Sequence, residues 1–552
     1  MTTTSNRPAK STLRALPRRF AGRALARILR LPAQTHNYTV SSVKVPMRDG
    51  IELVADHYEP VGEVVGTLLA RGPYGRAFPF SLIFAYLHAA RGYRVILQSV
   101  RGTFGSGGVF NPMADEVADG ADTVAWLRRQ PWFSGRFATI GISYLGFTQW
   151  AMLEDPPPEL AAAVITAGPH DLSASAWGTG SFTVNDFLGW SNLVAHQEDP
   201  GRIRAGIRQR RAQKHVVRAA GEVPLGAAGR ALLGEGATWW ENWLKPPKTE
   251  DPFWGALRVP DALDRVDVPV LLLSGWQDLF LPQTLQQYRQ LRDRGVEVAL
   301  TMGPWTHTEL LLAGLATIAK ETGDWLDTHL GDRPAEPRSG RVRFFVRGEG
   351  WRQLPDWPPA TTERALYLQP GGGLAETMPT AGSSASFRYD PNEPTPTIGG
   401  RLLSPDGGYR DDTALAARRD VLSFTSDALT ADLPVFGNPA AELTHSSDNP
   451  HVDVFVRISE VDAKGRSRNV SDAYRRLDGT SPDRDTVSLQ LDAVAHRFRA
   501  GSRIRVLVAG GSHPRFARNL GTGEAISTGN QLKPATHEVH FGTSRVVLPV
   551  GS

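Results

Sequence analysis

The chain has 552 residues, of which 41% are hydrophobic and 21% charged, so its composition predicts a globular protein of two or three domains. It contains no cysteine, which excludes disulfides, thiolate zinc sites and a cysteine nucleophile. No apolar run approaches the roughly 18 residues that a membrane-spanning helix needs. These features do not fix the compartment, and our expectation is a cytoplasmic protein.

The positive charge of the chain is concentrated in residues 1–35. This tail holds eight Lys or Arg and no Asp or Glu, and without those eight charges the net +4 of the chain becomes −4. A nucleic-acid partner is therefore not expected. The apolar residues of the tail recur at helical spacing, which predicts a basic amphipathic helix that contacts an anionic membrane surface. Pro17 interrupts this pattern, and a solvated leader is the alternative interpretation.

Residues 36–171 predict the first part of an α/β domain. Residues 38–59 alternate apolar and polar side chains around Arg48-Asp49-Gly50, which is typical of a β-hairpin. From residue 64 onward, apolar runs alternate with helical stretches such as 81–91 and 115–129. Such alternation predicts a parallel sheet that is covered by helices on both faces.

The strand pattern stops over residues 172–256, which are rich in tryptophan and have helical or irregular character. It resumes in 257–335, where 266–276 and 296–305 are predicted as two more buried strands. An insertion between strands of one sheet usually forms a cap over the site. The sequence therefore predicts a helical cap that divides the α/β domain into two parts.

The segment 331–340, GDRPAEPRSG, has the composition of a linker. Beyond it, residues 341–552 contain many short alternating strands separated by Gly, Pro and Asp turns. This pattern predicts an all-β sandwich or jelly roll as the C-terminal domain.

The stretch ATIGISYLGFTQW, residues 138–150, places Ser143 between an apolar strand and a helix-like segment. This arrangement is typical of a nucleophile elbow, whose strained turn lifts the serine hydroxyl clear of the sheet. The backbone N–H of Tyr144 would then point at a substrate carbonyl oxygen. The usual pattern is G-x-S-x-G, whereas here the second glycine is one residue later, at Gly146. A purely structural serine is the alternative.

A serine nucleophile needs a base and an orienting carboxylate, and the elbow fold places them in the order Ser, Asp, His after later strands. Asp278 follows the predicted strand 266–276, and His307 follows the next one. Each residue alone is more typical of a turn or of the surface. Together their order and strand context predict a catalytic triad of Ser143, Asp278 and His307.

Two other clusters are interpreted as structural. The Gly-rich stretch 101–108 lacks the Gly-Lys-Ser/Thr ending of a phosphate-binding loop. Four acidic residues lie at the start of the predicted helix 115–129, where they suit the helix dipole better than a metal site. We expect neither a metal nor another cofactor.

Several motifs together resemble the cocaine-esterase and X-Pro dipeptidyl-peptidase-like (CocE/NonD) serine hydrolases. They are GISYLGFTQW, RGPYGR at 71–76, GWQDLF at 275–280, GPWTHT at 303–308, and FLGWSNL and WWENWLKPP in the cap. The resemblance covers about 36–552. It implies an α/β-hydrolase domain with an inserted helical cap and a C-terminal jelly roll.

The resemblance also implies roles for particular residues. The elbow of this family is G-x-S-Y-x-G, so the late glycine becomes a match. Ser143 is the implied nucleophile, His307 the base and then the acid, and Asp278 the orienting group. The implied oxyanion hole consists of the Tyr74 hydroxyl and the N–H of Tyr144.

Substrates of this family bind where the three domains meet, which implies Trp177, Trp190 and Phe280 as walls. Aromatic walls favour a small-molecule ester with a neutral apolar or aryl acyl group. An X-Pro dipeptidyl-peptidase or aminoacyl ester hydrolase would need acids for a substrate ammonium, for which Asp186 and Glu198 are the candidates. A non-catalytic surface-binding protein is a distant alternative. A homodimer stays open.

Overall fold

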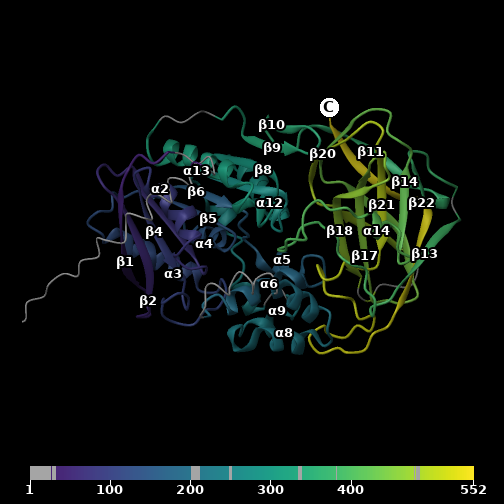
Figure 1. Ribbon diagram of the computed structural model, residues 1–552, viewed down its shortest axis with the longest axis horizontal. Helices are drawn as coiled ribbons and strands as arrows, with labels where there is room; N and C mark the ends of the chain where they lie inside the picture. The colour runs from purple at the N-terminus through teal and green to yellow at the C-terminus, as the bar shows by residue number, and fades with distance from the viewer. Residues whose placement is uncertain are drawn as a thin grey trace, which may run out of the picture.

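The computed structural model describes residues 27, 33–199, 212–247, 251–333, 338–380, 382–477, 479 and 485–551. Apart from Arg27, the amphipathic helix expected in the tail lies outside these residues. Within the described ranges, no helix combines the length and apolar character needed to cross a membrane. Figure 1 shows an α/β domain on one side, an all-β domain on the other, and a group of short helices beside both.

The α/β domain contains a ten-stranded sheet in the order β1-β2-β4-β3-β5-β6-β7-β8-β9-β10. β1 and β2 form the expected hairpin, with antiparallel pairing from Tyr38↔Pro60 to Pro46↔Glu52. From β4 to β9 neighbouring strands are parallel, so their carboxyl ends meet at one edge. The strands are β1 (Tyr38–Pro46), β2 (Glu52–Pro60), β3 (Gly66–Gly72), β4 (Tyr93–Ser99), β5 (Phe137–Ile142), β6 (Leu160–Thr166), β7 (Val270–Gln277), β8 (Val298–Thr306), β9 (Val342–Val346) and β10 (Gly350–Leu354).

Helices cover both faces of this sheet, which explains why its central strands are continuous apolar runs. Consecutive residues of β3 enter different cores: Leu68 packs on the face of α13, and Leu69 packs on the face of α3, α4 and α12. The helical segments of this domain are η1 (Ser81–Tyr86), α2 (Leu87–Ala89), α3 (Glu116–Arg128), α4 (Tyr144–Met152), α11 (Ala262–Arg265), α12 (Leu281–Asp293), η3 (Glu309–Leu311) and α13 (Leu315–His329).

The predicted start of the β domain at residue 341 needs a correction. β9 pairs in parallel with β8, from Leu300↔Val342 to Met302↔Phe344, and β10 pairs with β9. The α/β sheet therefore continues through Leu354. An alternating pattern shows that one face of a strand is buried, but it does not show which sheet the strand joins. In the structure, β9 buries Val342 and Phe344 against the α/β core.

The cap leaves the sheet after β6 and returns to it at β7, as the sequence predicted. Figure 1 places its helices below the gap between the two large domains. Residues 212–220 are also helical. The helical segments of the cap are α5 (Leu172–Trp177), α6 (Val184–Ala195), α8 (Leu225–Leu233), η2 (Gly234–Gly236), α9 (Trp240–Trp243) and α10 (Pro252–Gly255).

The C-terminal domain is a jelly roll whose strands form one continuous hydrogen-bonded network. Its longest strand, β22, pairs with β11, β13, β15 and β16 and so links both layers. The elements are β11 (Thr361–Leu368), η4 (Pro370–Gly372), β12 (Gly373–Ala375), β13 (Ser384–Tyr389), α14 (Thr413–Ala416), β14 (Val421–Ser426), β15 (Leu433–Gly437), β16 (Ala440–Ser447), β17 (Val452–Val461), β18 (Ser467–Leu477), β19 (Asp485–Gln490), β20 (Val494–Phe498), β21 (Arg503–Ala509) and β22 (Ala535–Gly551).

Candidate active site

Ser143 lies on the turn between β5 and α4, with φ 59° and ψ −120°. A residue with a side chain rarely adopts such a conformation, and its strain is typical of a functional position. Two backbone contacts hold the turn: the Ser143 N–H donates to the Thr166 carbonyl at 3.0 Å, and the Phe147 N–H donates to the Ser143 carbonyl at 3.1 Å. The serine therefore sits at the N-terminus of α4.

The glycines on either side of Ser143 allow the strand and the helix to approach each other closely. A Cβ at Gly141 would lie 2.4 Å from Cβ of Leu145, and a Cβ at Gly146 would lie 2.4 Å from Cα of Gly168. Neither position accommodates a side chain without moving the backbone. This spacing explains why the second glycine comes three residues after the serine.

His307 and Asp278 are joined by a short hydrogen bond at the same edge of the sheet. The distance from Nδ1 of His307 to Oδ2 of Asp278 is 2.6 Å. Asp278 is fully buried, and 8% of His307 is exposed. The other carboxylate oxygen of Asp278 accepts the N–H of Phe280 at 2.7 Å, which fixes the plane of the carboxylate.

Phe280, expected as a pocket wall, packs against the imidazole. Its ring centroid lies 5.5 Å from that of His307, and the two rings are nearly perpendicular at 82°. Such an edge-to-face contact restricts the rotation of the imidazole. The segment Asp278–Phe280 therefore orients His307 through both a hydrogen bond and a ring contact.

Tyr74 lies beside the serine, on the loop that follows β3. Its hydroxyl accepts the indole N–H of Trp190 at 3.0 Å, and the Ser143 side chain lies close enough to affect the pKa of the phenol. Burial raises the pKa of Tyr74, and the contacts with Trp190 and Ser143 oppose this shift. The phenol therefore stays protonated at neutral pH and keeps its proton available for donation.

The two cap tryptophans predicted as walls occupy different environments. Trp190 is stacked over Tyr144, with ring centroids 6.2 Å apart and planes 10° apart, and therefore lies at the site. Trp177 is 7% exposed, packs on Phe182 inside the cap, and donates its indole N–H to the Trp243 carbonyl at 2.9 Å. These contacts place Trp177 in the cap core rather than beside Tyr74.

Phe110 is an aromatic neighbour that the sequence did not indicate. Its ring lies 6.1 Å from that of Tyr144, 6.4 Å from Trp190 and 5.5 Å from Trp239. It follows the Gly-rich stretch 101–108, whose composition gave no sign of an aromatic lining. The described side chains around Tyr144 thus form a largely apolar surface.

The jelly roll contacts the segment that carries Asp278. Arg401 donates from one terminal nitrogen to the Leu279 carbonyl at 2.8 Å and from Nε to Asp492 at 2.6 Å. The jelly roll also reaches the cap, where the Leu403 N–H donates to Asp186 at 2.8 Å. The jelly roll therefore contacts both the segment that carries Asp278 and the cap.

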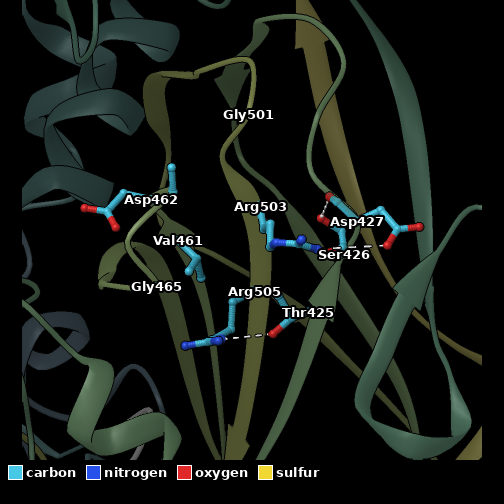
Figure 2. Close-up of a pocket in the computed structure, with 10 residues that line it drawn as sticks. Thr425, Ser426, Asp427, Val461, Asp462, Gly465, Gly501, Arg503 and Arg505 are labelled. Carbon is cyan, nitrogen blue, oxygen red and sulfur yellow. Dashed lines mark hydrogen bonds and ion pairs between the residues drawn. The ribbon is translucent and has the colours of Figure 1, made fainter.

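A separate open cleft of about 560 Å³ lies at one end of the jelly-roll strands (Figure 2). Arg505 donates to Thr425 at 3.0 Å, and Arg503 donates to the Ser426 carbonyl at 3.1 Å. The two arginines are balanced by two aspartates in the lining. This cleft contains none of the residues predicted to be catalytic.

Acidic residues near the start of α3 form ion pairs with arginines. Asp119 lies 2.6 Å from Arg101, and Asp122 lies 2.9 Å from Arg48. Within the part of the chain that the structure describes, no three His, Asp or Glu side chains come together as a metal-binding group. In the Gly-rich stretch, Ser106 donates to the Ser99 carbonyl at 2.8 Å and thereby tethers the loop to the end of β4.

A parallel sheet with a strained serine at the turn from strand to helix, and with a helical insertion between its later strands, defines the α/β-hydrolase class. The family description "X-Pro dipeptidyl-peptidase (S15 family)" matches residues 49–309, and "X-Pro dipeptidyl-peptidase C-terminal non-catalytic domain" matches residues 336–546. The chain belongs to the cocaine esterase and X-Pro dipeptidyl-peptidase-like family, and it is a serine hydrolase.

Individual relatives extend over nearly the whole chain. Cocaine esterase from Rhodococcus sp. (strain MB1 Bresler) is 30% identical over 93% of this chain and 99% of its own length. An aminopeptidase structure from a marine sediment Thaumarchaeota archaeon has a TM-score of 0.80 at 23% identity, covering 100% of this chain and 99% of that chain. An alpha-amino acid ester hydrolase structure has a TM-score of 0.76 at 23% identity, covering 94% and 98%. These two structures establish the shared fold.

Proposed function

We propose that this serine hydrolase cleaves carboxylic esters through an acyl-enzyme, with a preference for neutral apolar or aryl acyl groups. The observation that carries the proposal is the placement of Tyr74: its hydroxyl accepts from Trp190, and Trp190 stacks on Tyr144, which directly follows Ser143 on the strained turn. Burial keeps this phenol protonated, so it can donate to a developing oxyanion. The hydrogen-bonded pair His307 and Asp278 supports the proposal, since it follows the neighbouring strands β8 and β7.

In the proposed reaction, the hydroxyl oxygen of Ser143 attacks the ester carbonyl while Nε2 of His307 takes the serine proton. Asp278 holds Nδ1 of His307 protonated and stabilises the resulting imidazolium. The carbonyl oxygen becomes an oxyanion that accepts from the Tyr74 hydroxyl and the Tyr144 N–H. The tetrahedral intermediate then collapses, and the alcohol leaves with the proton from His307. Water repeats the sequence on the acyl-enzyme and releases the acid.

The preference for a neutral substrate rests on the two candidate acids of the cap. The buried Asp186 carboxylate accepts from the Asn185 side chain at 2.9 Å and from the Leu403 N–H. Glu198 is exposed and accepts the Phe104 N–H at 3.0 Å. Both acids therefore have partners within the protein. A substrate ammonium would have to displace one of these contacts, whereas an ester with an apolar acyl group would not.

The surroundings of Ser143 also favour an aromatic or apolar acyl group. Trp190 and Phe110, which are both partly exposed, present apolar ring surface next to the oxyanion donors. The relative named cocaine esterase, which matches this chain over nearly its full length, agrees with an aryl ester as substrate class.

A hydrolysis panel tests this substrate class. We expect kcat/KM for phenyl benzoate and p-nitrophenyl butyrate to exceed, by at least tenfold, that for a phenylalanine methyl ester or a Gly-Pro p-nitroanilide. A higher kcat/KM for the anilide would overturn the ester assignment in favour of an X-Pro peptidase. Ser143→Ala is the blank for each substrate.

The same panel distinguishes the two cap tryptophans. Trp190→Ala is expected to lower benzoate turnover much more than acetate turnover, because the lost ring faces the acyl group. Trp177→Ala is the matched control: it creates a cavity in the cap core, so we expect a lower melting temperature and a similar loss for every ester. If both variants lost benzoate and acetate turnover in the same ratio, Trp190 would not line the proposed acyl pocket.

Tyr74→Phe tests the proposed oxyanion donor. The substitution keeps the ring, which stacks on Phe80 at 5.3 Å, and removes only the hydroxyl. Loss of one oxyanion donor typically lowers kcat by about 10² to 10³-fold, so we expect a loss in this range with a KM close to that of the parent enzyme. Steady-state kinetics with p-nitrophenyl acetate give both parameters.

The melting temperature of Tyr74→Phe is the accompanying control. A tyrosine that only packs would lose stability and little rate, whereas an oxyanion donor loses rate at a nearly constant melting temperature. A kcat within about threefold of the parent would show that Tyr74 is no oxyanion donor, since loss of one such donor typically lowers kcat by about 10²-fold or more.

A further inference from the structure

A buried ionic network lies behind the two proposed oxyanion donors. The terminal nitrogen NH2 of Arg71 lies 2.9 Å from Oε2 of Glu116, and the two side chains are 1% and 4% exposed. Arg71 is near the end of β3, three residues before Tyr74, and Glu116 is the first residue of α3. The pair therefore connects the strand that leads to one donor with a helix next to the other.

The second oxygen of Glu116 holds Tyr144. The Tyr144 hydroxyl donates to Oε1 of Glu116 at 2.8 Å and accepts the Met113 N–H at 2.8 Å. Burial raises the pKa of Tyr144, as does the neighbouring Glu116, so the phenol remains a donor. With its side chain held at the far end, Tyr144 has little freedom to rotate about the turn that directs its backbone N–H.

Arg71 is held equally firmly on its other sides. Its Nε donates to the Gln98 side chain at 2.7 Å, and NH1 donates to the Glu116 carbonyl at 3.3 Å. A Cβ on Gly120 would lie 3.0 Å from NH1, so glycine at this position makes room for the guanidinium over α3. The Arg71 carbonyl in turn accepts from Thr148 of α4 at 3.1 Å.

Stability alone gives a weak explanation for this network. A buried ion pair costs so much desolvation that well-packed apolar residues of similar volume often stabilise a protein equally well. Both Arg71 and Glu116 are nevertheless almost completely buried, and their contacts converge on the segments of Tyr74 and Tyr144. The arrangement fits a requirement for a fixed distance between two hydrogen-bond donors.

We propose that Glu116 is a positioning residue for hydrolysis, which holds both oxyanion donors in register by binding the Tyr144 hydroxyl and the Arg71 guanidinium. The proposal rests on the proposed function, because it assumes that these donors act on an oxyanion. Glu116 acts only through Tyr144 and Arg71 and needs no contact with the substrate.

Tyr144→Phe tests this link without touching the ion pair or the backbone N–H. We expect kcat for p-nitrophenyl acetate to fall by about 10 to 100-fold, because a displaced donor stabilises the oxyanion less well, with KM within about twofold. Inhibition by phenylboronic acid, which forms a tetrahedral adduct with an active serine, should weaken in proportion to the loss in kcat/KM. Glu116→Gln keeps an acceptor for Tyr144 and loses the ionic contact, so a loss of about tenfold is expected.

Tyr93→Phe is the matched control. Tyr93 is buried at the opposite end of the sheet, donates to Asp327 at 2.7 Å, and Asp327 lies 2.7 Å from Arg91. The Tyr93→Phe variant thus loses a phenol hydrogen bond to a carboxylate that is paired with an arginine, as Tyr144→Phe does, but at a position far from Ser143. We expect it to lower the melting temperature as Tyr144→Phe does, with kcat and boronate inhibition unchanged.

The outcomes separate the two proposals. Equal kinetics for Tyr144→Phe and Tyr93→Phe would overturn the positioning role while leaving ester hydrolysis intact. A falling kcat with unchanged boronate inhibition would also overturn it, because the loss would then arise outside the oxyanion site. Failure of the proposed function would instead be seen as full activity in Ser143→Ala. Should Glu116→Gln fail to fold, Tyr144→Phe decides the question.

Discussion

Ser143→Ala and His307→Ala are each expected to lower kcat for p-nitrophenyl acetate by about 10⁶-fold, with substrate binding little changed. Ser143 supplies the only proposed nucleophile, and without the imidazole its hydroxyl remains protonated and unreactive. The remaining rate should come from the oxyanion donors and from bound water. Stopped assays at high enzyme concentration, with an active-site titration of the parent, measure losses of this size.

The double variant gives an internal control, because residues that act as a unit show non-additive losses. Ser143→Ala with His307→Ala should be no slower than Ser143→Ala alone. If the fold-losses of the two single variants multiplied in the double variant, the two residues would act independently. Ser143→Ala with more than about 1% of the parental kcat would point to a different nucleophile altogether.

Asp278→Asn is expected to lower kcat by about 10⁴-fold. In the parent enzyme, the Phe280 N–H donates to one carboxylate oxygen of Asp278. In the variant, the amide oxygen of the asparagine must take the position of this oxygen, because the amide NH2 cannot accept the Phe280 N–H. The amide NH2 then faces Nδ1 of His307, which can accept its hydrogen bond only as the tautomer protonated on Nε2. That tautomer cannot take the serine proton.

The structural control for this variant is its melting temperature, since both contacts of the side chain are retained in altered form. Phosphonylation of Ser143 should slow in parallel with kcat, because both reactions need the same base. A variant with more than about a tenth of the parental kcat would show that Asp278 does not set the tautomer of His307.

The sequence predicted the fold class because its strand, helix and turn patterns all indicated the same architecture. Continuous apolar runs indicated strands covered on both faces, and β3 indeed divides Leu68 and Leu69 between two cores. Candidate catalytic residues could be chosen because parallel strands bring their carboxyl ends to one edge. Order along the chain therefore translated into proximity, and His307 and Asp278 are in contact.

Other features depend on tertiary contacts that no local pattern encodes. β9 and β10 have the same alternation as the jelly-roll strands, yet Val342 pairs with Leu300 of the α/β sheet. Trp177 and Trp190 were indistinguishable as cap tryptophans, but only the latter reaches Tyr74. The pairing of Arg71 with Glu116 joins residues that are 45 positions apart, so no local pattern indicates it. In the sequence alone, acidic residues at the start of a helix are explained by the helix dipole.

The jelly roll has a defined relation to the proposed chemistry. Arg401 binds the carbonyl of Leu279, the residue directly after Asp278, and Asp492 fixes the guanidinium from the jelly-roll side. The position of the orienting carboxylate is thus linked to the placement of the whole C-terminal domain. Through this contact the C-terminal domain, in which none of the predicted catalytic residues lies, adjoins the segment of Asp278.

The central claim is that Ser143 is the nucleophile of an acyl-transfer site. The most direct measurement is the intact mass of the full chain after reaction with a fluorophosphonate, followed by peptide mapping. We expect one adduct per chain, located on Ser143, that is absent in Ser143→Ala and strongly slowed in His307→Ala. An adduct on another residue, or equal labelling of the parent enzyme and Ser143→Ala, would contradict the account.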